Sequence, residues 1–285
     1  MAASFHAHDD PGKASPWRRL SLALMLTTLA WLAGCAGPRI DAHTYRAVSQ
    51  DSRAQFLILH YTALDLERSI RVLTEQRVSS HYLVTDEARP RIYRLVDEDR
   101  RAWHAGVSHW SGHGMLNGNS IGIEIVNLGN ERGPDGRAEF RPYPPQQVEA
   151  VVELVRDIVR RHQIPPHRVL GHSDIAPQRK IDPGPLFPWK RLADEGLVLW
   201  PKDEQVQAAL ARYEGAVPPV AWFQQALLRH GFLVPEHGQL DEPTRRVLMA
   251  FQMKYRPERY DGQPDAQTAA LLTALTGYVH EAAAR

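Results

Sequence analysis

The order of apolar and polar positions divides most of the chain into strand-like and helix-like segments. The run Phe56–Tyr61 is almost wholly apolar, which predicts a strand that is covered on both faces. Within residues 120–128, Ile121, Ile123 and Ile125 share one face of a second predicted strand, and small or polar residues alternate with them. Further short strands are expected over residues 81–85, 91–96 and 168–171.

Helical spacing is clearest in the middle of the chain. Six apolar positions recur there every three or four residues: Val148, Val151, Val152, Val155, Ile158 and Val159. This helix should begin at Pro144-Pro145 and end before Pro165-Pro166, because proline suits a first turn and stops a helix. Another helix is expected over residues 66–76, and an exposed loop over 129–142. The sum predicts an α/β domain with a mixed central sheet flanked by helices.

A different texture begins after residue 219. Helices are predicted over residues 222–230, 241–252 and 266–275, and a turn-plus-helix unit occurs twice, as Asp241-Glu242-Pro243-Thr244 and as Asp265-Ala266-Gln267-Thr268. Residues 201–219 read as a connector that is helical or irregular. We therefore expect the α/β domain, large enough to be a catalytic domain, over residues 35–200 and a small three-helix domain over 220–280.

Composition narrows the class of protein. The 285 residues are 43% hydrophobic and 24% charged, as in ordinary soluble globular proteins, and they suffice for one sizeable domain and a small one. The formal net charge of +1 gives no electrostatic case for nucleic acid as a partner.

The N-terminal segment has the features of a secretory signal. Arg18 and Arg19 precede a short apolar run over residues 20–33, which is followed by the single cysteine of the chain, Cys35. One cysteine excludes an intrachain disulfide. The sequence Leu32-Ala33-Gly34-Cys35 resembles the lipobox of bacterial lipoproteins, in which the cysteine is acylated and becomes the mature N-terminus.

This resemblance predicts a signal peptide over residues 1–34 and a membrane anchor at Cys35. The residue after the cysteine is Ala36 and not an aspartate, which resembles the sorting signal of outer-membrane lipoproteins in enterobacteria. We therefore expect a lipid-anchored protein of the outer membrane that faces the periplasm. An ordinary signal peptide with an incidental cysteine is the alternative.

Five polar residues form a candidate metal hydrolase site. His60 and His172 each end a predicted strand, and Asp182 follows on a loop, so that two imidazoles and a carboxylate could hold zinc. Glu124 lies among isoleucines, where an ionised carboxylate is costly without a purpose, and could act as general base. Lys180 could stabilise an oxyanion. Taken singly, each residue has an ordinary structural explanation. His60 could cap the end of a strand, Glu124 could belong to a buried ion pair, and Lys180 could lie on the surface.

The order and context of these residues resemble the zinc-dependent N-acetylmuramoyl-L-alanine amidases of the amidase-2 type, relatives of the animal peptidoglycan recognition proteins. The matching segments include Trp103-His104-Ala105-Gly106 and Gly171-His172-Ser173-Asp174, and the full set covers residues 57–62, 78–84, 101–106, 119–124, 143–147, 171–177 and 179–184. The resemblance implies zinc ligands at His60, His172 and Asp182, a catalytic carboxylate at Glu124 and an intermediate-stabilising Lys180.

It also places Trp103, His104 and Asn119 near the substrate, although a structural hydrogen bond is an equal alternative for His104. The C-terminal segment resembles the three-helix peptidoglycan-binding domain of wall hydrolases, through residues 223–227, Thr244, Phe251-Gln252, Asp261-Gly262 and Thr268. Its aromatic residues are expected in the core, and no binding residue is assigned there.

The sequence therefore predicts a zinc amidase that cuts between N-acetylmuramic acid and the L-alanine of the stem peptide, with peptidoglycan or muropeptides as partners. Three alternatives stay open. A non-catalytic wall-binding lipoprotein would be expected to lack a zinc ligand, and a cytoplasmic amidase would lack the signal segment. A zinc peptidase would cut elsewhere in the stem peptide.

Overall fold

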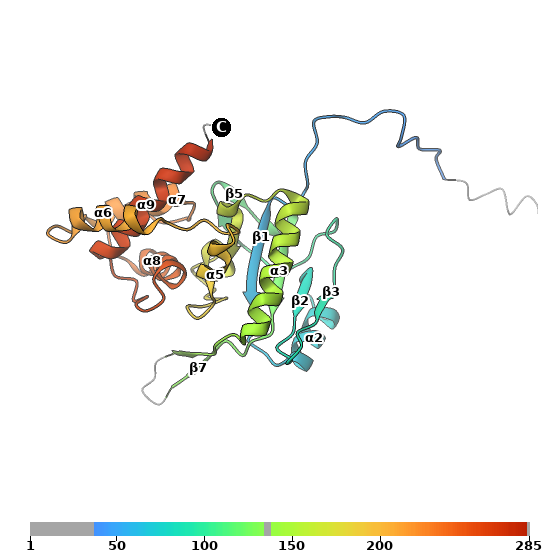
Figure 1. Cartoon of the computed structure of the whole chain (residues 1–285), viewed down its shortest axis with the longest axis horizontal. Coiled ribbons are helices and arrows are strands. Elements are labelled where there is room, and N and C mark those ends of the chain that lie inside the picture. Colours follow the sequence, from blue (N-terminus) through green and yellow to red (C-terminus); the bar gives the residue numbers. More distant parts are fainter. Residues whose placement is uncertain (1–36, 134–137, 284–285) are drawn as a thin grey trace, which may run out of the picture. The chain divides into compact units, whose positions relative to one another are not determined.

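The computed structural model describes residues 37–133 and 138–283, with side chains of the last helix described up to Leu275 (Figure 1). The described chain divides into two units, one that ends at Gln50 and one that begins at Asp51. Residues 37–50 of the first are exposed and contain neither helix nor strand, while the predicted signal segment and Cys35 lie outside the described residues. Among the helices of the described ranges, none is long and apolar enough to cross a membrane.

A five-stranded mixed sheet forms the centre of the second unit, with the strand order β3-β2-β6-β1-β9. Its strands are β1 (Phe56–Tyr61), β2 (Tyr82–Val84), β3 (Ile92–Arg94), β6 (Ser120–Ile125) and β9 (Val169–Gly171). Four of them run parallel, and only β3 pairs antiparallel, on β2. The predicted α/β class and mixed sheet are confirmed.

The register of the parallel strands brings the chemical residues to one end of the sheet. His60 of β1 is paired with Glu124 of β6, one residue before both strands end. β9 pairs with β1 and ends at Gly171, so His172 follows directly at the same end. Ligand sites of open α/β sheets form at this carboxyl end.

One face of the sheet is covered by the long helix α3 (Pro145–His162), which confirms the clearest helix prediction. Residues at odd positions of β1 and β6 point towards it, because successive side chains of a strand alternate between faces. They form one buried core with the apolar stripe of the helix: Leu57, Leu59, Ile121, Ile123, Val151, Val155 and Ile158.

The other face has two separate covers. Helix α2 (Leu66–Glu75) packs beside β2 through Leu73 and Leu83. Phe56 and Ile58 of β1 belong instead to the core of the C-terminal helices. The even positions His60 and Glu124 lie on this same face, where Glu124 lines a cavity.

The C-terminal region contains α6 (Asp203–Tyr213), α7 (Val220–His230), α8 (Glu242–Tyr255) and α9 (Ala266–Ala283). The three predicted helices are present, and α9 continues beyond the predicted end at residue 275. The connector, predicted as helical or irregular, contains α6, which packs on α9 with the Tyr213 hydroxyl 2.9 Å from Thr273 Oγ1. The described part of the C-terminal region, up to residue 283, therefore contains four helices.

The repeated unit of the sequence is a repeated hydrogen-bond pattern. In each copy a buried glutamine donates to a threonine in the first turn of the next helix and accepts from a glycine N–H in the loop between them. The sets are Gln224, Thr244 and Gly238 at 2.9 and 2.7 Å, and Gln252, Thr268 and Gly262 at 3.1 and 2.8 Å. Asp241 and Asp265 cap the two helices by accepting the threonine N–H.

The prediction of an exposed loop over residues 129–142 did not include the two strands that lie there. β7 (Asn130–Arg132) and β8 (Ala138–Phe140) pair there as an antiparallel ribbon. Most of its residues are exposed, so the sequence carries no alternation of apolar and polar positions that would predict a strand. Short elements also escaped prediction: β4 (His109–Trp110), β5 (His113–Gly114), α4 (His172–Ile175) and α5 (Trp189–Asp194).

Candidate active site

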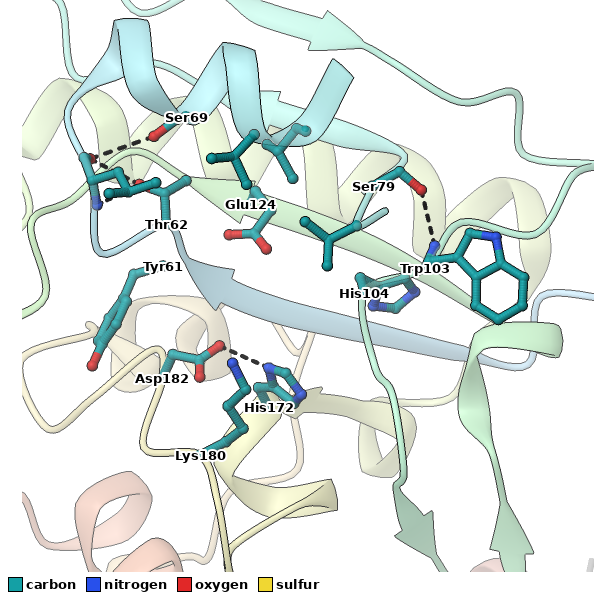
Figure 2. Close-up of a pocket in the computed structure, with 14 residues that line it drawn as sticks. Tyr61, Thr62, Ser69, Ser79, Trp103, His104, Glu124, His172, Lys180 and Asp182 are labelled. Carbon is teal, nitrogen blue, oxygen red and sulfur yellow. Dashed lines mark hydrogen bonds and ion pairs between the residues drawn. The ribbon is translucent and has the colours of Figure 1, made fainter. Parts of the chain in front are cut away.

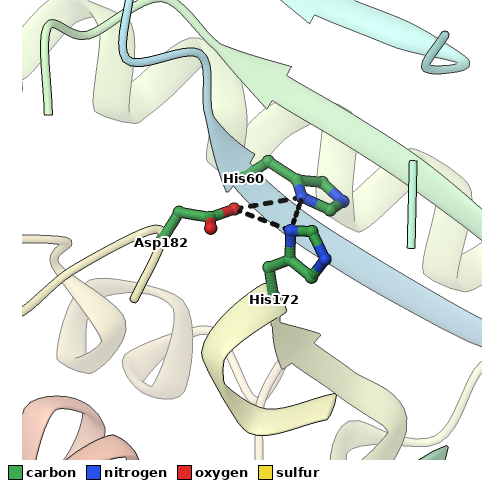
Figure 3. Close-up of side chains that lie close together, drawn as sticks. All are labelled: His60, His172 and Asp182. Carbon is green, nitrogen blue, oxygen red and sulfur yellow. Dashed lines mark hydrogen bonds and ion pairs between the residues drawn. The ribbon is translucent and has the colours of Figure 1, made fainter. Parts of the chain in front are cut away.

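The three predicted metal ligands converge on one point. His60 Nδ1 lies 2.9 Å from His172 Nδ1 and 3.1 Å from Asp182 Oδ2, and His172 Nδ1 lies 3.1 Å from the same oxygen (Figure 3). All three side chains are buried. Residues separated by as many as 122 positions in the sequence thus offer three ligand atoms to one small volume.

Backbone contacts fix the segment that carries two of these ligands. His172 is the first residue of α4, and Asp174 of the same turn accepts the Gly171 N–H at 2.9 Å. The Asp182 carbonyl in turn accepts the Ser173 N–H at 2.8 Å, which ties the following loop to the turn. The loop therefore folds back and returns Asp182 to His172.

The donor set fits zinc. Two imidazole nitrogens and a carboxylate oxygen are common ligands of a catalytic zinc, and tetrahedral ligands at about 2.0–2.1 Å from zinc lie roughly 3.3 Å apart. Burial lowers the pKa of His60 to about 4, which leaves the ring neutral at pH 7. Burial opposes ionisation of Asp182, but the charge interaction with His172 and hydrogen bonds from both histidines lower its pKa. A neutral imidazole and an ionised carboxylate are the states that bind metal.

Glu124 points into a cavity of about 180 Å³ next to the three ligands (Figure 2). Its Oε2 is buried and makes no hydrogen bond in the structure. Burial and the nearby Asp182 carboxylate raise the pKa of Glu124 well above its usual value, although Lys180 opposes the shift. A carboxyl group with a raised pKa and an uncommitted oxygen is suited to proton transfer.

Lys180 enters the cavity from the side opposite Glu124 (Figure 2). Within the described residues its ammonium group donates no hydrogen bond and forms no ion pair. It is therefore available to a carbonyl oxygen in the cavity.

The three candidate substrate contacts differ in position. Trp103 lines the cavity and is half-exposed, and the Arg101 guanidinium lies 4.1 Å from the centre of its ring. The backbone N–H of Trp103 donates to Ser79 Oγ. His104 lines the cavity but is almost fully buried. The structure does not bring Asn119 to the cavity, because it lies at the amino end of β6, where its carbonyl accepts from Gln55 and Phe56.

Several lining residues were not predicted as site residues. They come from the end of β1 and from α2 with the segment after it: Tyr61, Thr62, Leu64, Ser69, Val72, Leu73, Val78 and Ser79. No chemical signature distinguishes them in the sequence, because their part is to shape the cavity wall.

Comparison with known proteins agrees with this geometry. Residues 50–185 match the family model for N-acetylmuramoyl-L-alanine amidase, and residues 216–272 match a putative peptidoglycan binding domain. The N-acetylmuramoyl-L-alanine amidase AmiD of Escherichia coli K12 is 42% identical over 258 residues, which cover 86% of this chain and 93% of AmiD. The chain belongs to the N-acetylmuramoyl-L-alanine amidase family.

Solved structures support the family assignment across both regions. The E. coli AmiD complex with anhydro-N-acetylmuramic acid-L-Ala-D-γ-Glu-L-Lys matches at a TM-score of 0.77 and 41% identity, over 85% of this chain and 95% of that chain. AmpDh3 of Pseudomonas aeruginosa with anhydromuramic pentapeptide matches at 0.79 and 40%, over 85% and 99%. This amidase is thus a hydrolase that carries a peptidoglycan-binding region.

Proposed function

We propose that this amidase hydrolyses the amide between the lactyl group of N-acetylmuramic acid and L-alanine, with a zinc ion held by His60, His172 and Asp182. The observation that carries the proposal is the convergence of these ligands beside a carboxylate with an uncommitted oxygen. Zinc at that point would supply the Lewis acidity that activates a water molecule and polarises a carbonyl group.

Glu124 and Lys180 carry out the remaining chemistry. Glu124 takes a proton from the attacking water, which its raised pKa favours, and returns that proton to the departing amine of L-alanine. Lys180 faces it across the cavity and holds the negative charge that develops on the lactyl oxygen. Trp103, half-exposed beside the cavity, offers an apolar surface to the sugar or the peptide.

Product analysis by mass spectrometry tests the proposal. The purified protein would be incubated with a defined muropeptide as prepared, after chelation, and after zinc is restored. We expect an intact stem peptide with a free L-alanine amine, lost on chelation and regained with zinc. A cut between two amino acids would instead indicate a peptidase, and binding without cleavage at any zinc content would indicate a non-catalytic wall-binding protein.

We also propose that peptidoglycan or its soluble fragments are the partners of this protein, and that the C-terminal helices bind the wall. The muropeptides bound to AmiD and AmpDh3 in the related structures support the first part, and the match of residues 216–272 to a peptidoglycan-binding model supports the second. Pull-down of the purified protein, as wild type and as Glu124→Gln, with insoluble peptidoglycan measures the binding. If neither sediments with the wall, the partner assignment is wrong.

Lipid anchoring at Cys35 is a further proposal, supported by the sequence around the cysteine. It predicts that the full chain, expressed in a Gram-negative bacterium, incorporates radiolabelled palmitate and sediments with outer membranes. The Cys35→Ser variant should lose both the label and the sedimentation. Equal membrane recovery of both proteins, without label, would contradict the anchor.

A further inference from the structure

His60 is hydrogen-bonded on the side that faces away from the other ligands. Its Nε2 lies 3.0 Å from Nδ1 of His104, whose own Nε2 lies 3.1 Å from Ser120 Oγ. Ser120 Oγ lies 2.5 Å from the backbone carbonyl of Leu116. These residues are buried, so the chain of contacts is shielded from solvent.

The protons of this chain have one consistent arrangement. A carbonyl oxygen only accepts, so the Ser120 hydroxyl donates to Leu116 and must accept from His104 Nε2–H. A neutral imidazole carries one proton, and His104 uses it at Nε2, so its Nδ1 is an acceptor. Nδ1 then accepts from His60 Nε2–H, which leaves His60 Nδ1 with a free lone pair facing His172 and Asp182.

We propose that His104 is a positioning residue that fixes the tautomer and the ring orientation of His60 for metal binding, through Ser120 and the Leu116 carbonyl. Outer hydrogen bonds of this kind orient metal-binding histidines in general. The inference rests on the proposed zinc site, and it assigns His104 to the metal centre and not to the substrate.

The backbone around His104 keeps the ring in place. Asn117 Oδ1 accepts the N–H groups of both His104, at 3.0 Å, and Ala105, at 2.7 Å. Gly122 leaves room for the ring, because a Cβ there would lie 2.5 Å from His104 Cγ. The hydrogen bonds of Asn117 and the room left by Gly122 together hold the His104 imidazole against β6 and beside His60.

The same segment also reaches the second histidine ligand. The Ala105 carbonyl lies 3.2 Å from His172 Nε2, and Arg179 donates to that carbonyl as well. Arg179 Nη2 lies 3.3 Å from His172 Nε2. Two consecutive residues thus contact both histidine ligands from outside. The side chain of His104 contacts His60, and the carbonyl of Ala105 contacts His172.

Zinc affinity of the purified protein, measured by competition with a chromogenic chelator, is the first test. We expect His104→Leu to weaken zinc binding about 10- to 100-fold, the usual cost of losing an outer-shell partner. His230→Leu is the matched control, because His230 is also buried but packs in the C-terminal helices, where it should leave zinc affinity unchanged.

Two milder variants keep the test decisive if His104→Leu fails to fold. His104→Asn places an amide oxygen near the lost Nδ1 and should retain more zinc affinity than His104→Leu. Ser120→Ala keeps the imidazole but removes its anchor, and should weaken binding by a smaller factor than His104→Leu. Zinc affinity within twofold of wild type in all folded variants, with a raised KM for muropeptide, would make His104 a substrate contact and overturn the inference.

Nitrogen-15 NMR of the zinc-loaded wild-type protein tests the tautomer directly, without substrate. We expect His60 to bind zinc through Nδ1 and to show an Nε2–H proton that exchanges slowly, and this proton should exchange faster in Ser120→Ala. Zinc bound through Nε2 of His60 would refute the arrangement. Because neither readout uses catalysis, an inactive protein with the predicted NMR signature would contradict the proposed reaction and leave the role of His104 intact.

Discussion

Two buried glutamines of the C-terminal helices and the carboxylate of the cavity differ in how fully they are hydrogen-bonded. In the helices, the side-chain amides of Gln224 and Gln252 are fully hydrogen-bonded. Each NH₂ group donates to a threonine hydroxyl and a loop carbonyl, and each amide oxygen accepts a glycine N–H. In the cavity, Glu124 keeps an oxygen without a partner. His60, His172 and Asp182 direct their ligand atoms at one another.

The difference separates structural from functional polarity. A buried polar group without a partner costs about 1–3 kcal/mol, and the unpaired oxygen of Glu124 lies in the cavity that His172 and Asp182 also line. The glutamine–threonine pairs cost little and define the repeat of the helices. The unpaired oxygen of Glu124 and the three converging ligand atoms mark the place where metal, water and substrate are expected.

A buried ion pair joins the two regions. Lys254 of α8 donates to Asp174 at 2.8 Å, with both side chains almost fully enclosed, and its ammonium lies 4.3 Å from the Trp189 ring. Asp174 belongs to the turn that begins with His172. The C-terminal helices therefore contact the segment that presents a metal ligand.

The largest effect is expected at the unsatisfied carboxylate. Glu124→Gln keeps the shape of the side chain but cannot accept a proton, so kcat should fall about 10²- to 10⁴-fold. Zinc content, measured by atomic absorption, should stay at the wild-type level because Glu124 is not among the three ligands. Near-wild-type turnover would show that another group is the base.

The ion pair between the regions should contribute the next largest effect, on stability. Asp174→Asn leaves the buried Lys254 ammonium without a counter-charge and should lower the free energy of unfolding by about 3–5 kcal/mol. The double variant Asp174→Asn/Lys254→Met removes both charges and should recover part of this loss in urea titrations. A double variant less stable than the single one would contradict this account.

A glutamine of the repeat should affect stability alone. Gln252→Ala leaves Thr268 Oγ1 and the Gly262 N–H without their partner and should cost about 1–3 kcal/mol of unfolding free energy. Gln224→Ala is the matched variant in the other copy of the repeat. Zinc affinity should be unchanged in both, and a tenfold change in either would abolish the distinction between the two regions.

Acid should produce the smallest effect. Burial lowers the pKa of His81 to about 4 and that of His230 to about 3, so both rings are neutral in the folded protein. The unfolded chain takes up protons near pH 6.5, so stability is present above that pH and is lost as pH falls towards the folded values. Between pH 7 and 6 the two histidines should cost roughly 1 kcal/mol together.

Chemical denaturation at the two pH values measures this loss. His230→Leu should show a shallower dependence on pH than wild type, since one of the two buried rings is gone. An equal slope in both proteins would assign the acid sensitivity to other groups.

The apolar pattern predicted most of the regular elements. β1, β6 and α3 were predictable because each buries many apolar side chains at its own period. The ribbon of β7 and β8 was not, because it buries little and so shows no period. Helix α4 was missed because its four residues make about one turn, which is too short for apolar positions to recur at helical spacing.

By itself, the sequence determined which chemical groups are available and, through a family resemblance, which of them act together. His60, Glu124, His172, Lys180 and Asp182 carry side chains whose chemistry is visible in the primary structure. The repeat of the C-terminal helices was visible for the same reason, since each copy contains its own aspartate and threonine, whereas the paired glutamines became apparent only in the structure.

Tertiary structure alone decided how these groups are oriented. The tautomer of His60 depends on His104, Ser120 and a backbone carbonyl, and a carbonyl is the same in every residue. The unsatisfied state of Glu124 and the pairing of Lys254 with Asp174 depend likewise on which groups lie within hydrogen-bond distance after folding. Hydrogen bonds act over about 3 Å, and sequence separation carries no information at that scale.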